Sequence, residues 1–322
     1  MNSLKLYTEY IELELTKVDF PKEPTNLYDP LRYFLTLGGK RIRPVMTLLG
    51  AELFGTPKEV VISQALSIEV FHNFTLIHDD IMDDAPKRRN KQTVHDKWDT
   101  SIAILSGDAL IIKAYELLSQ IDPIKLPLAF ALLNKTALEV CEGQTMDTDF
   151  ETQEDVTIAK YIEMIRLKTS VLLGASLKMG ALIAGASEKD QNNLYNFGQN
   201  IGIAFQIQDD ILDLYADPDK FGKQVGGDVI ANKKTLLHLT AIGKATLEHR
   251  EIMNQLQNED NLNFKVSRTR QMFDQLKVKE DCQLMMQDYY NRAMKSLDAI
   301  EIDSDKKIKL IELAEFLIER NV

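Results

Sequence analysis

The chain has 322 residues, 44% hydrophobic and 27% charged, so it can bury a substantial core without covalent staples. Its net charge of -11 argues against nucleic acid and against anionic membrane surfaces as the main partner. Cys141 and Cys282 lie far apart, with no spacing typical of a disulfide framework or a zinc site, so we expect a cytoplasmic location.

Apolar residues recur at spacings of three and four along nearly the whole chain, and this pattern predicts helices. The first 15 residues are amphipathic and acidic, which indicates a surface helix rather than a signal peptide. The longest apolar runs, such as 180–186, are shorter than the roughly 20 residues that span a membrane, so we expect no transmembrane segment.

Further helices are predicted in chain order, and Pro86 is expected to end the third because proline lacks the amide hydrogen. No stretch alternates with period two, so we expect no sheet and one all-α domain over residues 1–322. The predicted ranges are 28–37, 43–54, 63–84, 101–118, 126–145, 155–184, 188–214, 233–255, 264–275, 279–298 and 304–320.

Two acidic motifs end apolar helical runs: DDIMD at 79–83 and DDILD at 209–213. On a helix, Asp79 and Asp83 point the same way, about 6 Å apart along the axis, and Asp80 is turned by roughly 100°. Asp209 and Asp213 share a face in the same way. One such motif alone is typical of a solvated helix end. Two copies favour a site where carboxylates hold Mg²⁺ and Mg²⁺ holds a polyphosphate.

Basic residues flank both motifs. Taken singly, each is more simply an exposed side chain, but their positions favour a grip on phosphate. They are Lys40, Arg41 and Arg43 in GGKRIRP, Arg88 and Arg89 in PKRRN, Lys168 beside Thr169 in RLKTS, Lys223 in FGKQVGGD and Lys233 in ANKKT. Phe74, five residues before Asp79, either closes a hydrophobic tunnel or packs in an ordinary core.

These motifs, together with TVHDKW-to-SGDAL at 93–110, resemble the trans-isoprenyl diphosphate synthases, or polyprenyl synthetases. The resemblance implies an all-α fold with core helices around a deep central cavity, and a homodimer. It also implies head-to-tail condensation of an allylic diphosphate with isopentenyl diphosphate. Many members read RRG after the first motif, whereas Asn90 stands here in place of the glycine.

The resemblance also implies roles for individual residues. Asp79 and Asp83 would bind two Mg²⁺ ions and Asp209 a third, with Asp80 and Asp213 as secondary ligands. Lys40, Arg43, His72 and Arg89 would hold isopentenyl diphosphate. Arg88, Lys168, Lys223 and Lys233 would hold the allylic diphosphate. Thr169 and Gln206 would lie beside the allylic carbon.

In the family, a bulky aromatic residue five positions before the first motif closes the tunnel and stops chain growth. Phe74 occupies that position in this sequence. We expect a C15–C20 product, leaning towards geranylgeranyl diphosphate. The alternatives are a longer-chain synthase, a class I terpene cyclase and a regulatory synthase subunit. The isopentenyl motif GGKRIRP argues against the cyclase, and two complete acidic motifs argue against the regulatory subunit.

Overall fold

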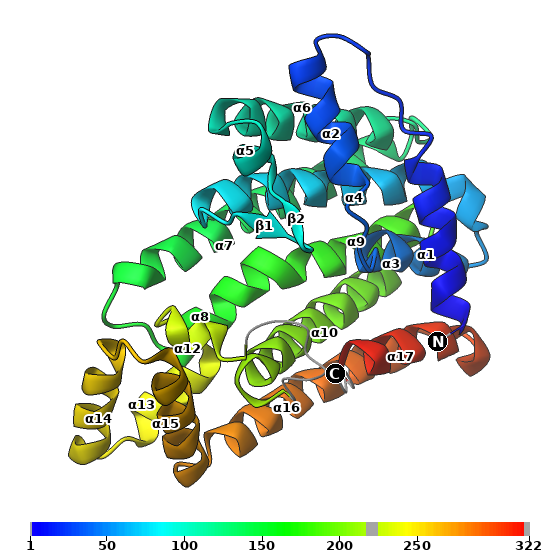
Figure 1. Cartoon of the computed structure of the whole chain (residues 1–322). Helices are drawn as coiled ribbons and strands as arrows, with labels where there is room; N and C mark the ends of the chain where they lie inside the picture. Colours follow the sequence, from blue (N-terminus) through cyan, green and yellow to red (C-terminus); the bar gives the residue numbers. More distant parts are fainter. Residues whose placement is uncertain (1, 217–224, 319–322) are drawn as a thin grey trace. The chain divides into compact units, whose positions relative to one another are not determined.

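The structure is a computed structural model that describes the backbone of residues 2–216 and 225–318. The regular secondary structure of these residues is helical apart from one short hairpin (Figure 1), so the all-α prediction is confirmed. The helices are α1 Asn2–Leu15, α2 Thr25–Leu35, α3 Ile42–Glu52, α4 Lys58–Met82, α5 Val94–Lys97, α6 Thr100–Leu118, α7 Leu126–Thr152, α8 Ile158–Ile165, the π-helical turn Arg166–Ser170, α9 Val171–Ile183, α10 Glu188–Tyr215, α12 Gly227–Ile230, α13 Leu236–Lys244, α14 Leu247–Gln257, α15 Leu262–Gln275, α16 Val278–Asp298 and α17 Ser304–Ile318.

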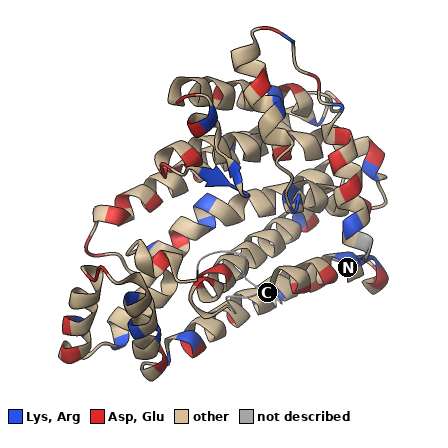
Figure 2. Cartoon of the chain, viewed as in Figure 1, with Lys and Arg blue, Asp and Glu red and all other residues tan. Residues whose placement is uncertain are grey.

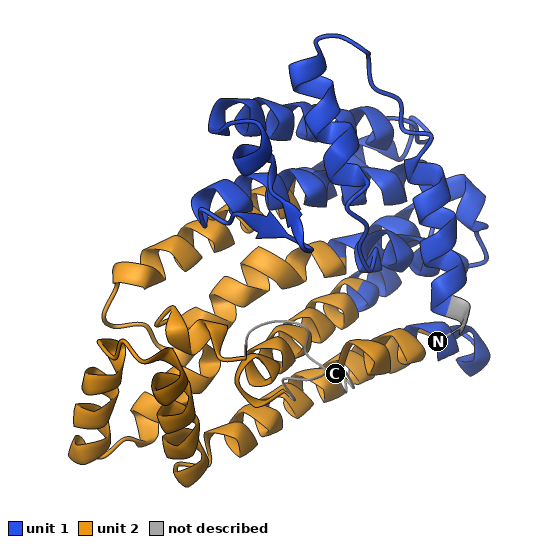
Figure 3. Ribbon diagram, in the orientation of Figure 1, with its two compact units in different colours: residues 1–134, 175–194, 302–310 blue, residues 135–174, 195–301, 311–322 orange. Residues whose placement is uncertain are grey.

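The described residues form two compact units, each assembled from separate stretches of chain (Figure 3). Unit 1 comprises residues 2–134, 175–194 and 302–310. Unit 2 comprises residues 135–174, 195–216, 225–301 and 311–318. The expectations of one domain over 1–322 and of a deep central cavity stay predictions.

Helix α4 forms the centre of unit 1, packed against α3 and α6. Every residue from Gln64 to Phe71 is buried, so this part of the helix is covered on all sides. By length and composition, α4 is the one helix among the described residues that could cross a membrane. Its apolar window is 61% buried inside the structure, which is the behaviour of a core helix. The first acidic motif lies at its C-terminal end.

The core of unit 2 gathers apolar faces of α8, α10, α13, α15 and α16 around Ile207, Leu236 and Phe273. Helix α13 packs on both α8 and α16, and α15 packs on α12, α14 and α16. The second acidic motif lies at the C-terminal end of α10 and therefore beside this core.

Two of the predicted helical ranges are interrupted in the structure, and α7 runs on to Thr152 rather than ending at residue 145. The range 155–184 contains the π-helical turn Arg166–Ser170 between α8 and α9. The range 233–255 is divided into α13 and α14, because Ala245 is extended and Thr246 caps α14 through the amide of His249. A side chain that bonds the first free amides of a helix fixes where that helix begins.

The expectation of no sheet was wrong at one point. Strands β1 Lys87–Arg88 and β2 Lys91–Gln92 pair antiparallel, with Lys87 opposite Gln92. Arg89 and Asn90 form the two-residue turn at φ 52° and 63°, as a type I′ hairpin requires. Asparagine tolerates this left-handed conformation better than most residues, so Asn90 suits the turn without a glycine. Strands of two residues are too short to show a period.

Candidate active site

The first acidic motif presents two aspartates one turn apart at the end of α4. Asp83 is the C-cap residue, and its backbone amide donates to the Asp79 carbonyl oxygen at 2.9 Å. The helical geometry therefore persists through Asp83, as the spacing predicted. The Asp79 side chain is 20% exposed and Asp83 is exposed, so carboxylate oxygens are available to a ligand at both positions.

Asp80 points the other way, into unit 1, where its side chain is only 2% exposed. Arg88 on β1 donates from Nε to both of its oxygens at 2.9 Å and from Nη2 to Oδ1 at 2.8 Å. Arg88 Nη2 also lies 3.7 Å from Asp79 Oδ2. Burial raises the pKa of Asp80, and its bonds with Arg88 oppose that rise. Asp80 thus fixes the hairpin, which Figure 2 shows as a basic element, beside the motif. Its assignment as a secondary metal ligand stays a prediction.

Arg43 and His72 lie in contact in unit 1, with Arg43 Nη1 2.9 Å from His72 Nε2. Burial, and then the charge of Arg43, hold the pKa of His72 well below its usual value, so its neutral ring accepts from the guanidinium. Burial also lowers the pKa of Arg43 to about 10. Arg43 Nε is buried and has no hydrogen-bond partner among the described residues. A buried donor of this kind is rare unless a ligand completes it.

Arg89 completes this basic group from the hairpin turn. Its guanidinium covers Gly39, where a β-carbon would lie 2.8 Å from Arg89 Nη1. Gly39 has φ +149°, so the close approach and the backbone both require glycine. Lys40 follows on the exposed side of the loop. The structure therefore brings Arg43, His72 and Arg89 together in unit 1.

Arg41 differs from its neighbours in GGKRIRP because it turns inward. It donates to Glu12 Oε1 at 2.8 Å, to Glu69 Oε1 at 2.6 Å and to the Leu35 carbonyl at 2.9 Å. Its side chain has no exposed surface, and its backbone is left-handed at φ 49°. Arg41 is thus an internal clamp that anchors the loop, and nothing in the sequence distinguishes it from the two cations beside it.

The second acidic motif lies at the end of α10 in unit 2. Asp209 is half-buried, and Asp213 accepts from the backbone amide of Asp228 at 3.0 Å. Asp210 is 5% exposed and accepts from the Tyr161 hydroxyl at 2.5 Å and from the Leu236 amide at 3.2 Å. Burial raises the pKa of the Asp210 carboxyl to about 7.

Tyr161 was not identified from the sequence, where it reads as one more large residue on the buried face of α8. Burial and the Asp210 carboxylate raise its pKa well above the usual value, so it donates a proton to Asp210. Gln206, predicted beside the allylic carbon, lies one turn before Asp210. Its Nε2 is 3.5 Å from Asp210 Oδ1, at the limit of a hydrogen bond.

Lys168 and Thr169 lie in the π-helical turn, a distortion that is frequent at functional sites. Lys168 Nζ pairs with Asp147 Oδ2 on α7 at 2.5 Å. Helix α7 approaches this turn so closely that a β-carbon at Gly143 would lie 2.2 Å from the Lys168 backbone nitrogen. Asp147 is a further residue that the motifs did not reveal. Lys223 lies outside the described residues.

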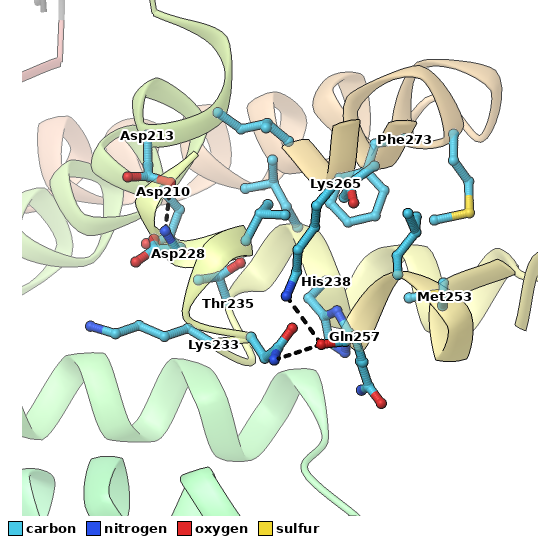
Figure 4. Close-up of a pocket in the computed structure, with 17 residues that line it drawn as sticks. Asp210, Asp213, Asp228, Lys233, Thr235, His238, Met253, Gln257, Lys265 and Phe273 are labelled. Atoms are coloured by element: carbon cyan, nitrogen blue, oxygen red, sulfur yellow. Dashed lines mark hydrogen bonds between the residues drawn. The ribbon is translucent and has the colours of Figure 1, made fainter. Parts of the chain in front are cut away.

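A cavity of about 50 Å³ opens beside the second motif (Figure 4). Its lining includes Asp213, Asp228 and the exposed Lys233, together with the buried apolar side chains of Met253, Met272 and Phe273. In Figure 4 the Lys233 side chain extends on the side of Asp228 and away from Met253. A cation and two carboxylates therefore line the same cavity in unit 2.

The carboxylates can be tested for their fit to a metal ion. In the described ranges, no three His, Cys, Asp or Glu side chains lie close enough to enclose one. Closed zinc sites need more protein ligands than this. Paired aspartates one turn apart instead fit a hard cation that completes its oxygen shell with water and phosphate. Asp79 belongs to unit 1 and Asp209 to unit 2, so the approach of the two motifs stays a prediction.

Comparison with known proteins places this chemistry in one family. Residues 24–276 match the polyprenyl synthetase family. The chain is 40% identical to a geranylgeranyl pyrophosphate synthase of Geoglobus acetivorans, with 98% of this chain and 97% of that protein covered. It is 36% identical to a geranylfarnesyl diphosphate synthase of Natronomonas pharaonis, over 93% and 92% of the two chains. A crystal structure of a geranylgeranyl pyrophosphate synthase superposes with a TM-score of 0.94 at 42% identity, covering all of both chains.

The chain belongs to the polyprenyl synthetase family. Membership implies a prenyltransferase that depends on a metal ion and uses allylic and isopentenyl diphosphates as substrates. The resemblance read from GGKRIRP and the two acidic motifs is thereby confirmed.

Proposed function

We propose that this protein condenses an allylic diphosphate of C5–C15 head to tail with isopentenyl diphosphate. It releases diphosphate and forms a trans-prenyl diphosphate of C15–C20, leaning towards geranylgeranyl diphosphate. The observation that carries the proposal is that two helices of this family member end in paired, ligand-accessible aspartates with cations beside them.

The basic group of unit 1 is proposed to bind isopentenyl diphosphate. The buried Arg43 Nε is a donor that a diphosphate oxygen would satisfy, and neutral His72 holds the Arg43 guanidinium in place. Arg89 and the exposed Lys40 add positive charge at the same loop. Charge-assisted bonds from guanidinium groups to phosphate are among the strongest that proteins form.

The allylic diphosphate is proposed to be held by four basic residues, Arg88, Lys168, Lys223 and Lys233. Asp79 and Asp83 would hold two Mg²⁺ ions, and Asp209 a third, with Asp80 and Asp213 secondary. Bound Mg²⁺ stabilises the negative charge that develops on the leaving diphosphate as the allylic carbon–oxygen bond breaks. Thr169 and Gln206 would turn oxygens towards the positive charge left on carbon.

The proton lost after condensation is proposed to leave with the diphosphate. His78, next to the first motif, is a poor base at Nε2 because this nitrogen lies 3.1 Å from the Ile104 carbonyl and donates to it. An active site that excludes water would protect the carbocation from quenching.

Product length is proposed to depend on Phe74. Its ring is half-buried, 5.6 Å from Phe71 and 4.8 Å from His78 between centroids, so its neighbours hold it in place. Relatives named for C20 and C25 products show similar identity, 40% and 36%, so identity alone does not select the length. A longer-chain synthase is the second candidate.

The protein is also proposed to be a homodimer. Helix α6 exposes three large apolar side chains: Ile104 at 43%, Leu105 at 58% and Ile112 at 68%. An exposed apolar stripe of this kind is typical of an interaction surface. Light scattering after gel filtration should give twice the chain mass, and Leu105→Glu should give the monomer. A cytoplasmic location stays a prediction.

The function is tested by incubating purified protein with Mg²⁺, isopentenyl diphosphate and each of three allylic primers, C5, C10 and C15. We expect prenyl diphosphates up to C20 with each primer and none with chelator present. A terpene cyclase would instead release hydrocarbon without consuming isopentenyl diphosphate, and a regulatory subunit would be inactive with all three primers. A product beyond C20 would select the longer-chain synthase.

A further inference from the structure

Lys265 on α15 carries an ammonium group into the interior of unit 2. The residue is 4% exposed and lines the cavity described above. Its Nζ donates to the Gln257 carbonyl at 3.2 Å (Figure 4). It also donates to the Ile230 carbonyl at 3.4 Å. Gln257 is the last residue of α14 and Ile230 the last residue of α12.

This arrangement explains how the ammonium is tolerated. A buried charge is costly unless hydrogen bonds compensate it. The carbonyl oxygens at helix C-terminal ends carry partial negative charge and lack partners within the helix. Lys265 joins two such ends with one side chain. Asn232 reinforces the junction because its Nδ2 donates to the same Gln257 carbonyl at 3.3 Å.

The segment held in this way carries Lys233. The Lys233 amide donates to the Asp228 carbonyl at 2.9 Å, which fastens it to α12. At the other end of α12, the Asp228 amide donates to Asp213 Oδ2 at 3.0 Å. Helix α12 is therefore tied at its start to the second acidic motif and at its end to Lys265, and Lys233 is the third residue after it.

We propose that Lys265 is a positioning residue that sets the Lys233 ammonium for the allylic diphosphate by joining the ends of α12 and α14. The proposal rests on the proposed function, in which Lys233 binds that diphosphate. Lys265 acts through Lys233, since its own ammonium is buried against carbonyl oxygens. Isopentenyl diphosphate, assigned to the basic group of unit 1, does not depend on it.

The test is a double-mutant cycle of Lys265→Met and Lys233→Ala, with Michaelis constants measured for geranyl diphosphate and for isopentenyl diphosphate. Loss of one charge-assisted hydrogen-bond system predicts about a tenfold rise in the allylic KM for Lys265→Met. The isopentenyl KM is expected to stay within about twofold. Lys265→Met should add nothing in the Lys233→Ala background, because coupled residues are not additive. Additive effects, or equal rises in both KM values, would overturn the proposal.

Lys244→Met is the matched control. Lys244 lies in the same unit and pairs with Asp281 at 2.5 Å, away from α12. The same loss of charge should leave both KM values unchanged. Lys265→Arg keeps a cation at the junction and should restore most of the allylic KM. Two results with folded proteins would contradict the assignment: a wild-type allylic KM in Lys265→Met, or an allylic KM in Lys265→Arg that is as high as in Lys265→Met.

Two further measurements keep the outcomes separate. If both Lys265 variants fail to fold, Asn232→Gly removes the second donor to Gln257 at an exposed position with φ 54°, which glycine adopts freely. It should raise the allylic KM about threefold; no change overturns the proposal. A wild-type protein that transfers no prenyl group instead refutes the proposed function. In that case, weaker calorimetric binding of inorganic diphosphate with Mg²⁺ to Lys265→Met still supports the positioning role, and equal binding refutes it.

Discussion

The two acidic motifs have nearly the same sequence but different surroundings. In each, the second aspartate turns inward and fastens the segment that follows: Asp80 is 2% exposed by side chain and Asp210 5% by residue. Asp80 meets a cation, Arg88, on the hairpin. Among the residues that the structure describes, the donors to Asp210 are neutral: the Tyr161 hydroxyl and the Leu236 amide, with Gln206 at the limit of a hydrogen bond.

The difference shows that a buried aspartate at the same motif position can be compensated either by a cation or by neutral hydrogen-bond donors. Burial raises the pKa of Asp80, and the Arg88 guanidinium opposes that rise. Neutral donors leave Asp210 poorly compensated, and burial raises its pKa to about 7. In both regions the outward aspartates, Asp79 and Asp209, are proposed to bind metal. The inward aspartates, Asp80 and Asp210, form hydrogen bonds with neighbouring segments.

The largest effect is expected from removing an outward carboxylate. Asp79→Asn and Asp209→Asn should each lower the prenyl-transfer rate about 10²–10³-fold, because each weakens stabilisation of the leaving diphosphate. Steady-state rates over a Mg²⁺ titration would measure this. Asp84→Asn is the control, since Asp84 is fully exposed, follows the motif directly and takes no part in the proposed site. An equal loss of prenyl-transfer rate in all three variants would mean that the motif aspartates contribute no more than a surface aspartate does.

The regions also differ five residues before each motif, where Phe74 is half-buried and Ala204 is fully buried. Phe74→Ala should lengthen the main product by at least one C5 unit, because it opens space beneath Asp79. Mass spectrometry of the dephosphorylated alcohols would show the shift. Ala204→Gly shortens the side chain at the same offset from the second motif and should leave the product unchanged. An unaltered product from Phe74→Ala would mean that another residue is the floor.

The inward aspartates should differ in stability when neutralised. Asp80→Asn breaks a bidentate ion pair and should cost about 2 kcal/mol. Asp210→Asn should cost under about 1 kcal/mol at pH 7, since the amide oxygen still accepts from Tyr161 or Leu236 and no cation is left unpaired. Urea unfolding in the presence of chelator gives both values. A larger loss of stability in Asp210→Asn than in Asp80→Asn would show that the folded chain depends more on the charge of Asp210 than on the Asp80–Arg88 ion pair.

The smallest effect is expected from pH in the cavity beside the second motif. Burial, and then the charge of Lys234, lower the pKa of His238 to about 4. The unfolded chain, with a histidine pKa near 6.5, therefore binds more protons between pH 6.5 and 4, and stability falls as pH drops through this window. The contribution lost between pH 8 and 5.5 is about 1 kcal/mol. His238→Gln should flatten the unfolding free energy against pH by that amount; an unchanged slope would mean His238 charges freely in the folded chain.

Much of the fold was readable from periodicity. Helices α4 and α10 were predicted to within a few residues at the end that carries each motif, because an apolar helix followed by a polar cluster marks its own boundary. The same spacing predicted that Asp79 and Asp83 lie one turn apart. The π-helical turn was not readable, since it arises where Gly143 lets α7 approach Lys168.

The sequence by itself determined the helices, the two motifs and the family, because local spacing sets which side chains share a helix face. Only the tertiary structure decided which charged residues face inward. Arg41 looks like its two neighbours until Glu12 and Glu69 are placed around it. Tyr161 meets Asp210 across 49 residues, and Lys265 joins helix ends 27 residues apart in the chain. Such contacts depend on packing between distant segments, and no local pattern of residues encodes them.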